Sequence, residues 1–213
     1  MDRLTHWEQV YRTKEPDQVS WFQADARLSR EMIVGAVPDR TASIIDIGAG
    51  ASTLADGLLG AGYRHLTVMD LSSAALELAK ARLGPLASSV TWQTADVLTA
   101  ALPAQAFDVW HDRAVFHFLT DAVDRARYVA QVCHAVRPGG IVLVATFAED
   151  GPLRCSGLEV ARYSAAELHA QFGPAFTVLT SDRELHTTPS GATQAFTYCV
   201  LQLARAGHVT VGV

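Results

Sequence analysis

From residue 43 onward, short apolar runs alternate with longer stretches that have helical spacing. Continuous apolar runs predict buried strands at residues 44–47, 66–69, 90–94, 107–111 and 141–147. Helical spacing followed by glycine or proline predicts helices at residues 52–60, 72–83 and 121–136. Because strands without polar alternation are buried on both faces, this rhythm predicts a parallel sheet covered by helices on both sides.

The last part of the chain breaks this rhythm. A short helix is predicted at residues 164–171, and residues 176–185 and 194–203 then alternate like strands. The few residues between them include Pro189 and Gly191 and are too short for a crossover helix, so the two strands must pair antiparallel. We therefore predict an α/β fold in which a hairpin extends a five-stranded parallel sheet, followed by an edge strand or a disordered tail after residue 205.

The first forty residues have a different character. Residues 2–11 and 24–37 show helical spacing, and the polar stretch between them ends in Trp21 and Phe22. The pattern breaks at residues 37–42, around Pro38. We expect one domain over residues 1–213, with an N-terminal helical appendage at 1–40 and a core at 41–203.

Composition narrows the classes of function. The 213 residues are 49% hydrophobic and 18% charged, enough for one well-buried domain, and the net charge of −5 argues against binding to a phosphate backbone. No window reaches the ~18 apolar residues of a membrane-spanning helix, and the start lacks the apolar region of a secretory signal. The three distant cysteines, Cys133, Cys155 and Cys199, fit a reducing cytoplasm and show no metal-ligand spacing. We expect a cytoplasmic protein without a metal, in which Cys133 and Cys199 are buried.

A nucleotide-binding constellation follows the predicted strands. The first strand carries Asp46 and runs into a turn with Gly48 and Gly50, where a backbone can approach a ligand closely. Asp70 ends the second strand, where a carboxylate accepts the hydroxyls of a ribose, and Asp96 follows the third, where it can meet an adenine amino group. Each residue alone is also explained by a tight turn or a helix cap. Their common order predicts a nucleoside cofactor.

An oxidoreductase that uses NAD(P) is the rival enzyme class. Its fingerprint requires a third glycine three residues after Gly50, where this chain has Thr53. The C-terminal hairpin is also foreign to that topology. The dinucleotide interpretation therefore loses support.

The sequence resembles the class I S-adenosylmethionine-dependent methyltransferases over residues 40–203. The matching motifs are Asp46-Ile47-Gly48-Ala49-Gly50-Ala51-Ser52, Asp70, Asp96 and Arg137-Pro138-Gly139-Gly140. The resemblance implies a Rossmann-like seven-stranded sheet with strand order 3-2-1-4-5-7-6 and strand 7 antiparallel. It implies S-adenosylmethionine as the cofactor and S-adenosylhomocysteine as its product. The implied cofactor contacts are Asp46, Gly48, Ala49, Gly50, Asp70, Leu71, Asp96, Val97 and His111.

The N-terminal pattern resembles a narrower subgroup, which includes the elongation factor 1A lysine methyltransferase 2 type and bacterial enzymes of small molecules. The pattern consists of Trp7, Tyr11 and the pair Trp21–Phe22. Because aromatic faces attract cations, these residues are candidates for a lid over the sulfonium and the acceptor. The alternative is that they only attach the N-terminal helices to the sheet.

The resemblance also places contacts to the methionine end of the cofactor and to the acceptor at the end of the fourth strand and just after it. The candidates there are His111, Asp112, Arg113 and His117. Asp112 is expected to balance cofactor charge, Arg113 to pair with Asp112 or bind an acidic acceptor, and His117 to take a proton. The alternatives are a local ion pair between Asp112 and Arg113 and a packed His117 between two phenylalanines.

Cys155 is a further candidate on the acceptor side, where Arg154 is expected to lower the pKa of its thiol. The predicted function is methyl transfer to nitrogen, sulfur or oxygen of a small molecule or a protein side chain. A lysine acceptor predicts an acidic groove near Asp112, and a small apolar acceptor predicts a closed aromatic pocket. A cofactor-binding sensor or scaffold without turnover is the non-enzyme alternative.

Overall fold

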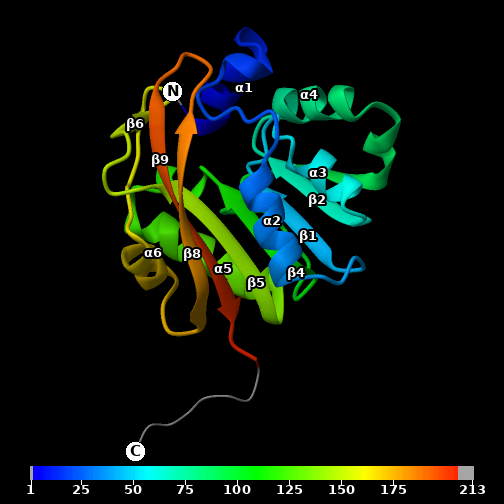
Figure 1. The fold of residues 1–213 in the computed structure, drawn as a ribbon, viewed down its shortest axis with the longest axis vertical. Helices are drawn as coiled ribbons and strands as arrows, with labels where there is room; N and C mark the ends of the chain where they lie inside the picture. Colours follow the sequence, from blue (N-terminus) through cyan, green and yellow to red (C-terminus); the bar gives the residue numbers. More distant parts are fainter. Residues whose placement is uncertain (1, 206–213) are drawn as a thin grey trace, which may run out of the picture.

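A seven-stranded sheet forms the centre of the computed structural model, which describes residues 2–205 (Figure 1). Its order is β3-β2-β1-β4-β5-β9-β8. The strands are β1 (Ser43–Ile47), β2 (His65–Asp70), β3 (Val90–Thr94), β4 (Phe107–Arg113), β5 (Val136–Phe147), β8 (Phe176–Thr187) and β9 (Thr193–Leu203). The first five pair in parallel, and β9 pairs antiparallel with both β5 and β8. The predicted fold and strand order are confirmed.

Three details differ from the prediction. The fourth strand continues to Arg113, so Asp112 and Arg113 belong to the strand itself, while His117 lies after it. The fifth strand begins at Val136, because Val136 pairs with Phe107 before an irregularity at the Pro-Gly-Gly segment, after which the ladder resumes at Ile141. A separate hairpin of β6 (Arg154–Cys155) and β7 (Leu158–Glu159) was not predicted. The question of a strand or tail after residue 205 concerns residues outside the described part of the chain.

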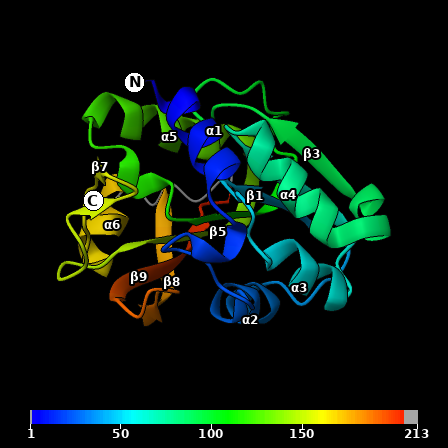
Figure 2. The ribbon, with the colours of Figure 1, turned by 90° about the horizontal axis from the view of Figure 1, so that it is seen from above.

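Helices cover the two faces of the sheet in separate layers (Figures 1 and 2). The first face packs on α2 (Arg27–Ala36), α3 (Leu54–Gly60) and α4 (Ser73–Leu83), and the second on α5 (Ala122–Ala135) and α6 (Ala165–Phe172). Neighbouring strand residues alternate between these cores, so that Ile44 faces the first layer and Ile45 the second. Short 3₁₀ turns occur at η2 (Gly84–Ser89) and η3 (Phe116–Phe118). None of the helices described between residues 2 and 205 is long and apolar enough to cross a membrane.

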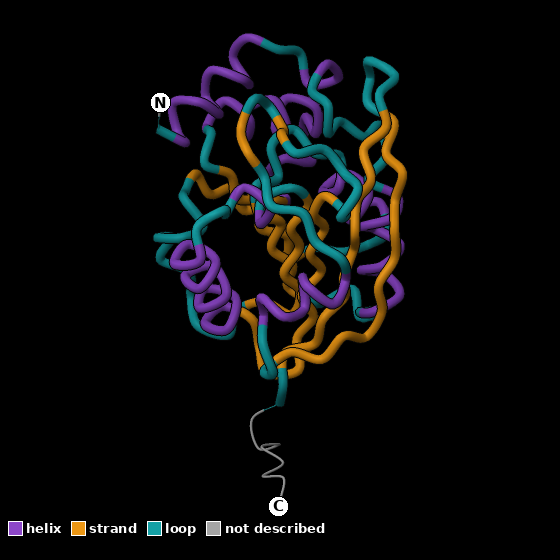
Figure 3. Tube along the Cα trace, turned by 90° about the vertical axis from the view of Figure 1, so that its left-hand side faces the viewer, coloured by secondary structure: helices purple, strands orange, loops and turns teal. Residues whose placement is uncertain are grey.

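The N-terminal segment lies across the end of the sheet at which the parallel strands finish (Figure 3). It consists of α1 (Arg3–Thr13), capped by Asp2, and the 3₁₀ turn η1 (Pro16–Gln18) before α2. Glu8 in α1 accepts hydrogen bonds from the backbone N–H of Ser73 at 2.6 Å and of Ala74 at 3.3 Å. Since the first N–H groups of a helix lack partners within it, Glu8 caps α4 from a distant part of the chain.

A buried hydrogen-bond network joins β4 to α5. Trp110 Nε1 donates to the Tyr128 hydroxyl at 2.8 Å, which donates to Asp112 Oδ2 at 2.6 Å. The carboxylate of Asp112 also accepts the backbone N–H groups of Val115 at 2.8 Å and Phe116 at 3.0 Å. Asp112 and Tyr128 are fully buried, so the network sets the path of the chain as it leaves β4.

The Tyr128 hydroxyl is the centre of this network, and its removal tests the network. We expect Tyr128→Phe to lower the free energy of unfolding by about 2 kcal/mol, because Trp110 and Asp112 then each lose a buried partner. Urea denaturation with fluorescence detection measures the effect. Tyr163→Phe is the control, because among the described residues no hydrogen bond to its hydroxyl is found, and it should change stability by less than about 0.5 kcal/mol. Equal effects of the two substitutions would contradict the assignment.

Candidate functional site

Two adjoining cavities lie beyond the carboxyl ends of β1, β2 and β4, at the point where the strand order reverses. Their volumes, open mouths included, are about 790 and 530 Å³. They share four wall residues, which are Trp21, Ile47, Gly48 and Arg113. Ligands of open α/β sheets bind at such a switch point, and the volumes suit a small-molecule ligand.

The turn after β1 passes very close to two other segments. Gly48 and Gly50 have φ angles of +57° and +53°, which disfavour residues with a side chain. A β-carbon on Gly48 would lie 2.0 Å from Val115 Cγ2, and one on Gly50 would lie 2.1 Å from the Tyr11 hydroxyl. The turn therefore requires glycine at both positions, for conformation and for space.

Asp70 lines the larger cavity at the end of β2. Its carboxylate accepts the backbone N–H of Gly50 at 2.7 Å and that of Ser72 at 2.8 Å. Burial raises the pKa of Asp70 to about 6, against the opposing effect of these hydrogen bonds. The group is thus held rigidly, with its charge partly desolvated, beside the glycine turn.

Asp96 lies in the same cavity and has two sets of contacts. Its Oδ1 accepts the N–H of Leu98 at 2.9 Å, so it does cap the following turn. Its Oδ2 lies 3.6 Å from Arg3 of α1, which lies equally far from Asp124 of α5. Ion pairs of Arg3 therefore hold the N-terminal helix at the mouth of the cavity.

Aromatic rings from the N-terminal segment line the larger cavity. Trp7 packs edge-to-face on Trp21 at 5.6 Å and on Phe118 at 5.1 Å between ring centroids. Tyr11 lies 6.3 Å from Trp21, and burial together with the charge of Asp70 raises its pKa. The cavity wall opposite the sheet is therefore aromatic and comes from residues distant in sequence.

Arg113 ties this aromatic wall to the C-terminal hairpin. Its guanidinium donates to Glu184 Oε2 at 3.1 Å, to the Tyr198 hydroxyl at 2.8 Å and to the carbonyl of Trp21 at 3.2 Å. Gln23 donates to the other oxygen of Glu184 at 2.8 Å. The predicted ion pair between Arg113 and Asp112 is wrong, because Arg113 pairs with Glu184 and its charge is balanced there.

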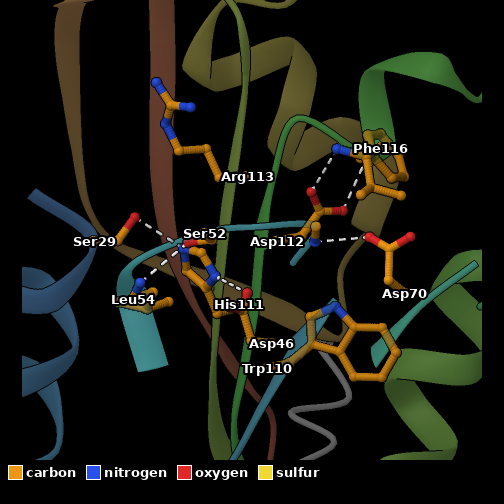
Figure 4. A network of polar contacts seen from close by, with 12 residues as sticks. Ser29, Asp46, Ser52, Leu54, Asp70, Trp110, His111, Asp112, Arg113 and Phe116 are labelled. Atoms are coloured by element: carbon orange, nitrogen blue, oxygen red, sulfur yellow. Dashed lines mark hydrogen bonds and ion pairs between the residues drawn. The ribbon is translucent and has the colours of Figure 1, made fainter. Parts of the chain in front are cut away.

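The smaller cavity contains a chain of three buried polar side chains (Figure 4). His111 Nδ1 lies 2.6 Å from Asp46 Oδ1, and His111 Nε2 lies 2.9 Å from the Ser29 hydroxyl. The second oxygen of Asp46 is buried without a hydrogen-bond partner among residues 2–205. A buried carboxylate oxygen without a donor is costly, so this atom points to a ligand that donates a hydrogen bond.

Most of the predicted site residues lie in one cavity or the other. The larger cavity is lined by Trp7, Tyr11, Asp70, Leu71, Asp96, Val97 and Cys155, the smaller by Phe22, Asp46, Ala49 and His111, and both by Trp21, Gly48 and Arg113. Gly50 lines neither, but it packs directly beneath Tyr11.

Asp112 and His117 lie outside both cavities. Successive strand residues point to opposite faces, so Asp112 turns toward α5 while His111 and Arg113 face the site (Figure 4). His117 is fully buried and accepts the N–H of Phe147 at 3.3 Å. Burial, with a smaller effect of Arg113, lowers its pKa to about 3. The structure therefore places neither residue where it contacts a ligand of these cavities, contrary to the expectation.

Two expectations about cysteines are wrong. Burial raises the pKa of the Cys155 thiol to about 11, and Arg154 pairs with Glu159 instead of activating the thiol. Cys133 is exposed, although Cys199 is buried as expected.

Sequence reasoning missed Arg3, Ser29, Phe118 and Glu184. Phe118 follows the motif segment closely and was within reach of a search for aromatic residues near it. The other three come from α1, α2 and β8, and no local pattern connects them to the glycine turn.

Comparisons with known proteins agree with this geometry. Residues 44–140 match the family model of a methyltransferase domain. An uncharacterized methyltransferase of Mycobacterium tuberculosis is 30% identical over 115 residues, which cover 52% of this chain and 53% of that protein. The chain spans about half the length of the curated relatives of this kind that it matches.

Solved structures share the whole fold at low identity. One solved structure comes from work on the conversion of a disulfide bond into a thioacetal group during echinomycin biosynthesis. It has a TM-score of 0.78 at 18% identity, and the match covers 95% of this chain and 94% of that chain. The N-methyltransferase NodS of Bradyrhizobium japonicum, solved with S-adenosylhomocysteine, has a TM-score of 0.69 at 15% identity, covering 93% and 98%. Residues 44–140 thus match a methyltransferase-domain family, and the whole chain shares the fold of solved S-adenosylmethionine-dependent methyltransferases.

Proposed function

We propose that the protein transfers the methyl group of S-adenosylmethionine to a small, largely apolar acceptor. One observation carries the proposal. A single cavity contains both the carboxylates suited to a nucleoside, Asp70 and Asp96, and a wall of aromatic rings that includes Trp7 and Phe118. Cofactor and acceptor then share one cavity, as direct transfer requires.

The residues present fit the cofactor. Asp70 and Asp96 suit the ribose hydroxyls and the adenine amino group, and apolar side chains such as Leu71 and Val97 line the same cavity. The unpartnered oxygen of Asp46 in the adjoining cavity suits an ammonium group. The glycine turn, whose residues have no side chains to block the approach, lies between these two ends.

The chain contributes positioning, exclusion of water and electrostatics. When bound, the cofactor supplies a methyl group attached to a sulfonium. The sulfur leaves as a neutral thioether, so the leaving group needs no proton. The rings of Trp7, Trp21 and Phe118 provide the faces that attract such a cation and exclude water from it. We therefore assign the N-terminal segment, residues 1–40, to a lid over the core at 41–203, in one functional unit.

The titratable groups of the larger cavity decide which acceptors can react, because an acceptor without a base nearby must lose its proton by itself. Asp70 and Asp96 are assigned to the cofactor, and the raised pKa values of Tyr11 and Cys155 leave both groups protonated at neutral pH. The charge of Arg113 is balanced by Glu184. We infer an acceptor whose attacking atom loses its proton in solution, such as a thiol or an acidic hydroxyl.

The closed wall also favours a small molecule over a protein. An acidic groove for a lysine is not formed by Asp112, which is fully buried and turned toward α5. The rings of Trp7 and Phe118 are in contact in the cavity wall. An apolar wall of this kind suits a small molecule better than a charged lysine side chain.

The raised pKa of Asp70 predicts how cofactor binding depends on pH. The ionised carboxylate accepts hydroxyl hydrogen bonds, so the affinity for S-adenosylhomocysteine should be constant above pH 7 and fall as the pH drops through about 6. Asp70→Asn should weaken binding at pH 7.5 by about 10- to 100-fold and flatten this profile. Calorimetric titration from pH 5 to 8 measures both effects.

The effect of Asp70 on protein stability cannot account for weaker binding at low pH. The pKa of Asp70 in the folded protein lies above the 3.8 of a free aspartate, so this carboxyl contributes stability below about pH 4 and loses it as the pH rises through about 6. Acidification therefore favours folding at this group while it weakens binding. Asp39→Asn, on the exposed turn before β1, is the control and should leave the profile unchanged. A profile in Asp70→Asn identical to that of the native protein would contradict the assignment.

A panel of acceptors tests the proposed chemistry. With labelled S-adenosylmethionine, we expect transfer to apolar thiols or acidic phenols, and none to lysine-containing peptides. Because the cavity offers no free base, the rate should follow ionisation of the acceptor, and its apparent pKa should shift with the acceptor along a series. An apparent pKa that stays constant across the series, or transfer to peptides alone, would contradict the proposal.

Glu184 offers a test of the lid. Glu184→Ala removes the partner of Arg113, Tyr198 and Gln23. We expect about fivefold weaker binding of S-adenosylhomocysteine, equivalent to about 1 kcal/mol, and faster tryptic cleavage after Arg12 and Lys14. Glu159→Ala, which removes an exposed ion pair with Arg154, is the control and should change neither quantity. Unchanged cleavage and affinity in Glu184→Ala would show that the hairpin does not hold the lid.

A further inference from the structure

The chain of Asp46, His111 and Ser29 is more elaborate than a nucleotide site requires. It connects β1, β4 and α2, and its three side chains are 4%, 3% and 1% exposed. A carboxylate only accepts hydrogen bonds, which assigns the donor role in this contact to His111 Nδ1 and the acceptor role to Asp46 Oδ1. When the imidazole is neutral, Nε2 is an acceptor, and its partner is the Ser29 hydroxyl.

This arrangement holds the carboxylate of Asp46 in one orientation. With Oδ1 occupied by His111, the buried Oδ2 is left without a donor among residues 2–205, in the wall of the smaller cavity. Rotation of the carboxylate would break the 2.6 Å contact to His111. The ring of His111 is in turn fixed by Ser29, so the orientation of Asp46 depends on where α2 lies.

The position of α2 is itself tied to the glycine turn. The Thr53 hydroxyl, just before α3, accepts the N–H of Ala26 at 3.1 Å and donates to the carbonyl of Gln23 at 3.2 Å. Ile33 of α2 is fully buried in the core of the first sheet face. Ser29 is therefore presented to His111 by a helix that is docked on the rigid core.

Resting on the proposed function, we propose that Ser29 and His111 are positioning residues for the amino-acid end of the cofactor. They hold Asp46 so that its free oxygen receives the α-ammonium group. Ser29 acts only through His111, and His111 acts only through Asp46. The N-terminal appendage then contributes to recognition of the amino-acid end through α2, as well as covering the acceptor through α1.

A nucleophilic role for Ser29 is the competing interpretation of the same hydrogen bonds. An attacking serine must present its oxygen to an acyl group and needs donors aimed at the resulting oxyanion. The 1% exposure of Ser29 argues against such access. Burial holds all three side chains in fixed positions, which a positioning role requires. The same burial keeps a substrate from reaching the Ser29 hydroxyl.

The test compares two ligands that share the adenosine and differ in the amino-acid end. S-adenosylhomocysteine carries the α-ammonium, and 5′-methylthioadenosine lacks the amino-acid end. In calorimetric titrations, Ser29→Ala should weaken the first ligand by about 3- to 10-fold and His111→Phe by more than about tenfold, while 5′-methylthioadenosine changes less than about twofold in each. The double variant should be no weaker than His111→Phe alone, because the two residues act in series.

Controls separate this result from general damage. Retained binding of 5′-methylthioadenosine shows that each variant keeps a folded adenosine site, and Ser88→Ala, at an exposed turn, should affect neither ligand. Equal weakening of both ligands, additive effects in the double variant, or labelling of Ser29 by a fluorophosphonate would each overturn the inference. Failure of the native protein to bind either ligand would instead overturn the proposed function.

Discussion

The site depends on a close approach of three segments around the turn after β1. Val115, from the loop after β4, and Tyr11, from α1, lie so near this turn that a β-carbon at Gly48 or Gly50 would collide with them. Asp70 fixes the same turn from β2 by accepting the N–H of Gly50. Since the turn is held on three sides, the carboxylates at the strand ends keep fixed positions relative to one another, which is the preorganisation that ligand binding and methyl transfer require.

One strand supplies both the site and an anchor of the fold. In β4 the side chains alternate, so His111 and Arg113 face α2 and the cavities while Trp110 and Asp112 face α5. The first pair holds Asp46 and the aromatic wall, and the second joins the buried network around Tyr128. A disturbance of the network therefore reaches the site through the strand itself, although no atom of Asp112 lines either cavity.

The N-terminal segment is connected to four separate parts of the core. Glu8 caps α4, Arg3 lies near Asp96, and the segment around Trp21 is held by the β4 and β8 residues Arg113 and Glu184. The contacts of Glu8 and Arg3 are exposed and individually weak, whereas those of Arg113 and Glu184 are partly buried. Such an arrangement suits the lid role proposed for this segment.

The sequence by itself determined the parallel sheet with its terminal hairpin, the glycine turn and the acidic residues at the ends of β1, β2 and β3, because apolar runs and turn residues are local signals. The strand order followed from the resemblance of these motifs to a known family. Only the tertiary structure decided which of the residues around His111 face the site. Side chains alternate between the two faces of the sheet only as far as β4 extends, and the end of a strand is poorly marked in sequence. It also decided that Arg113 pairs with Glu184 instead of its neighbour Asp112, and that Ser29 meets His111. These contacts join segments far apart in the chain, and a contact between distant segments has no periodic trace in either of them.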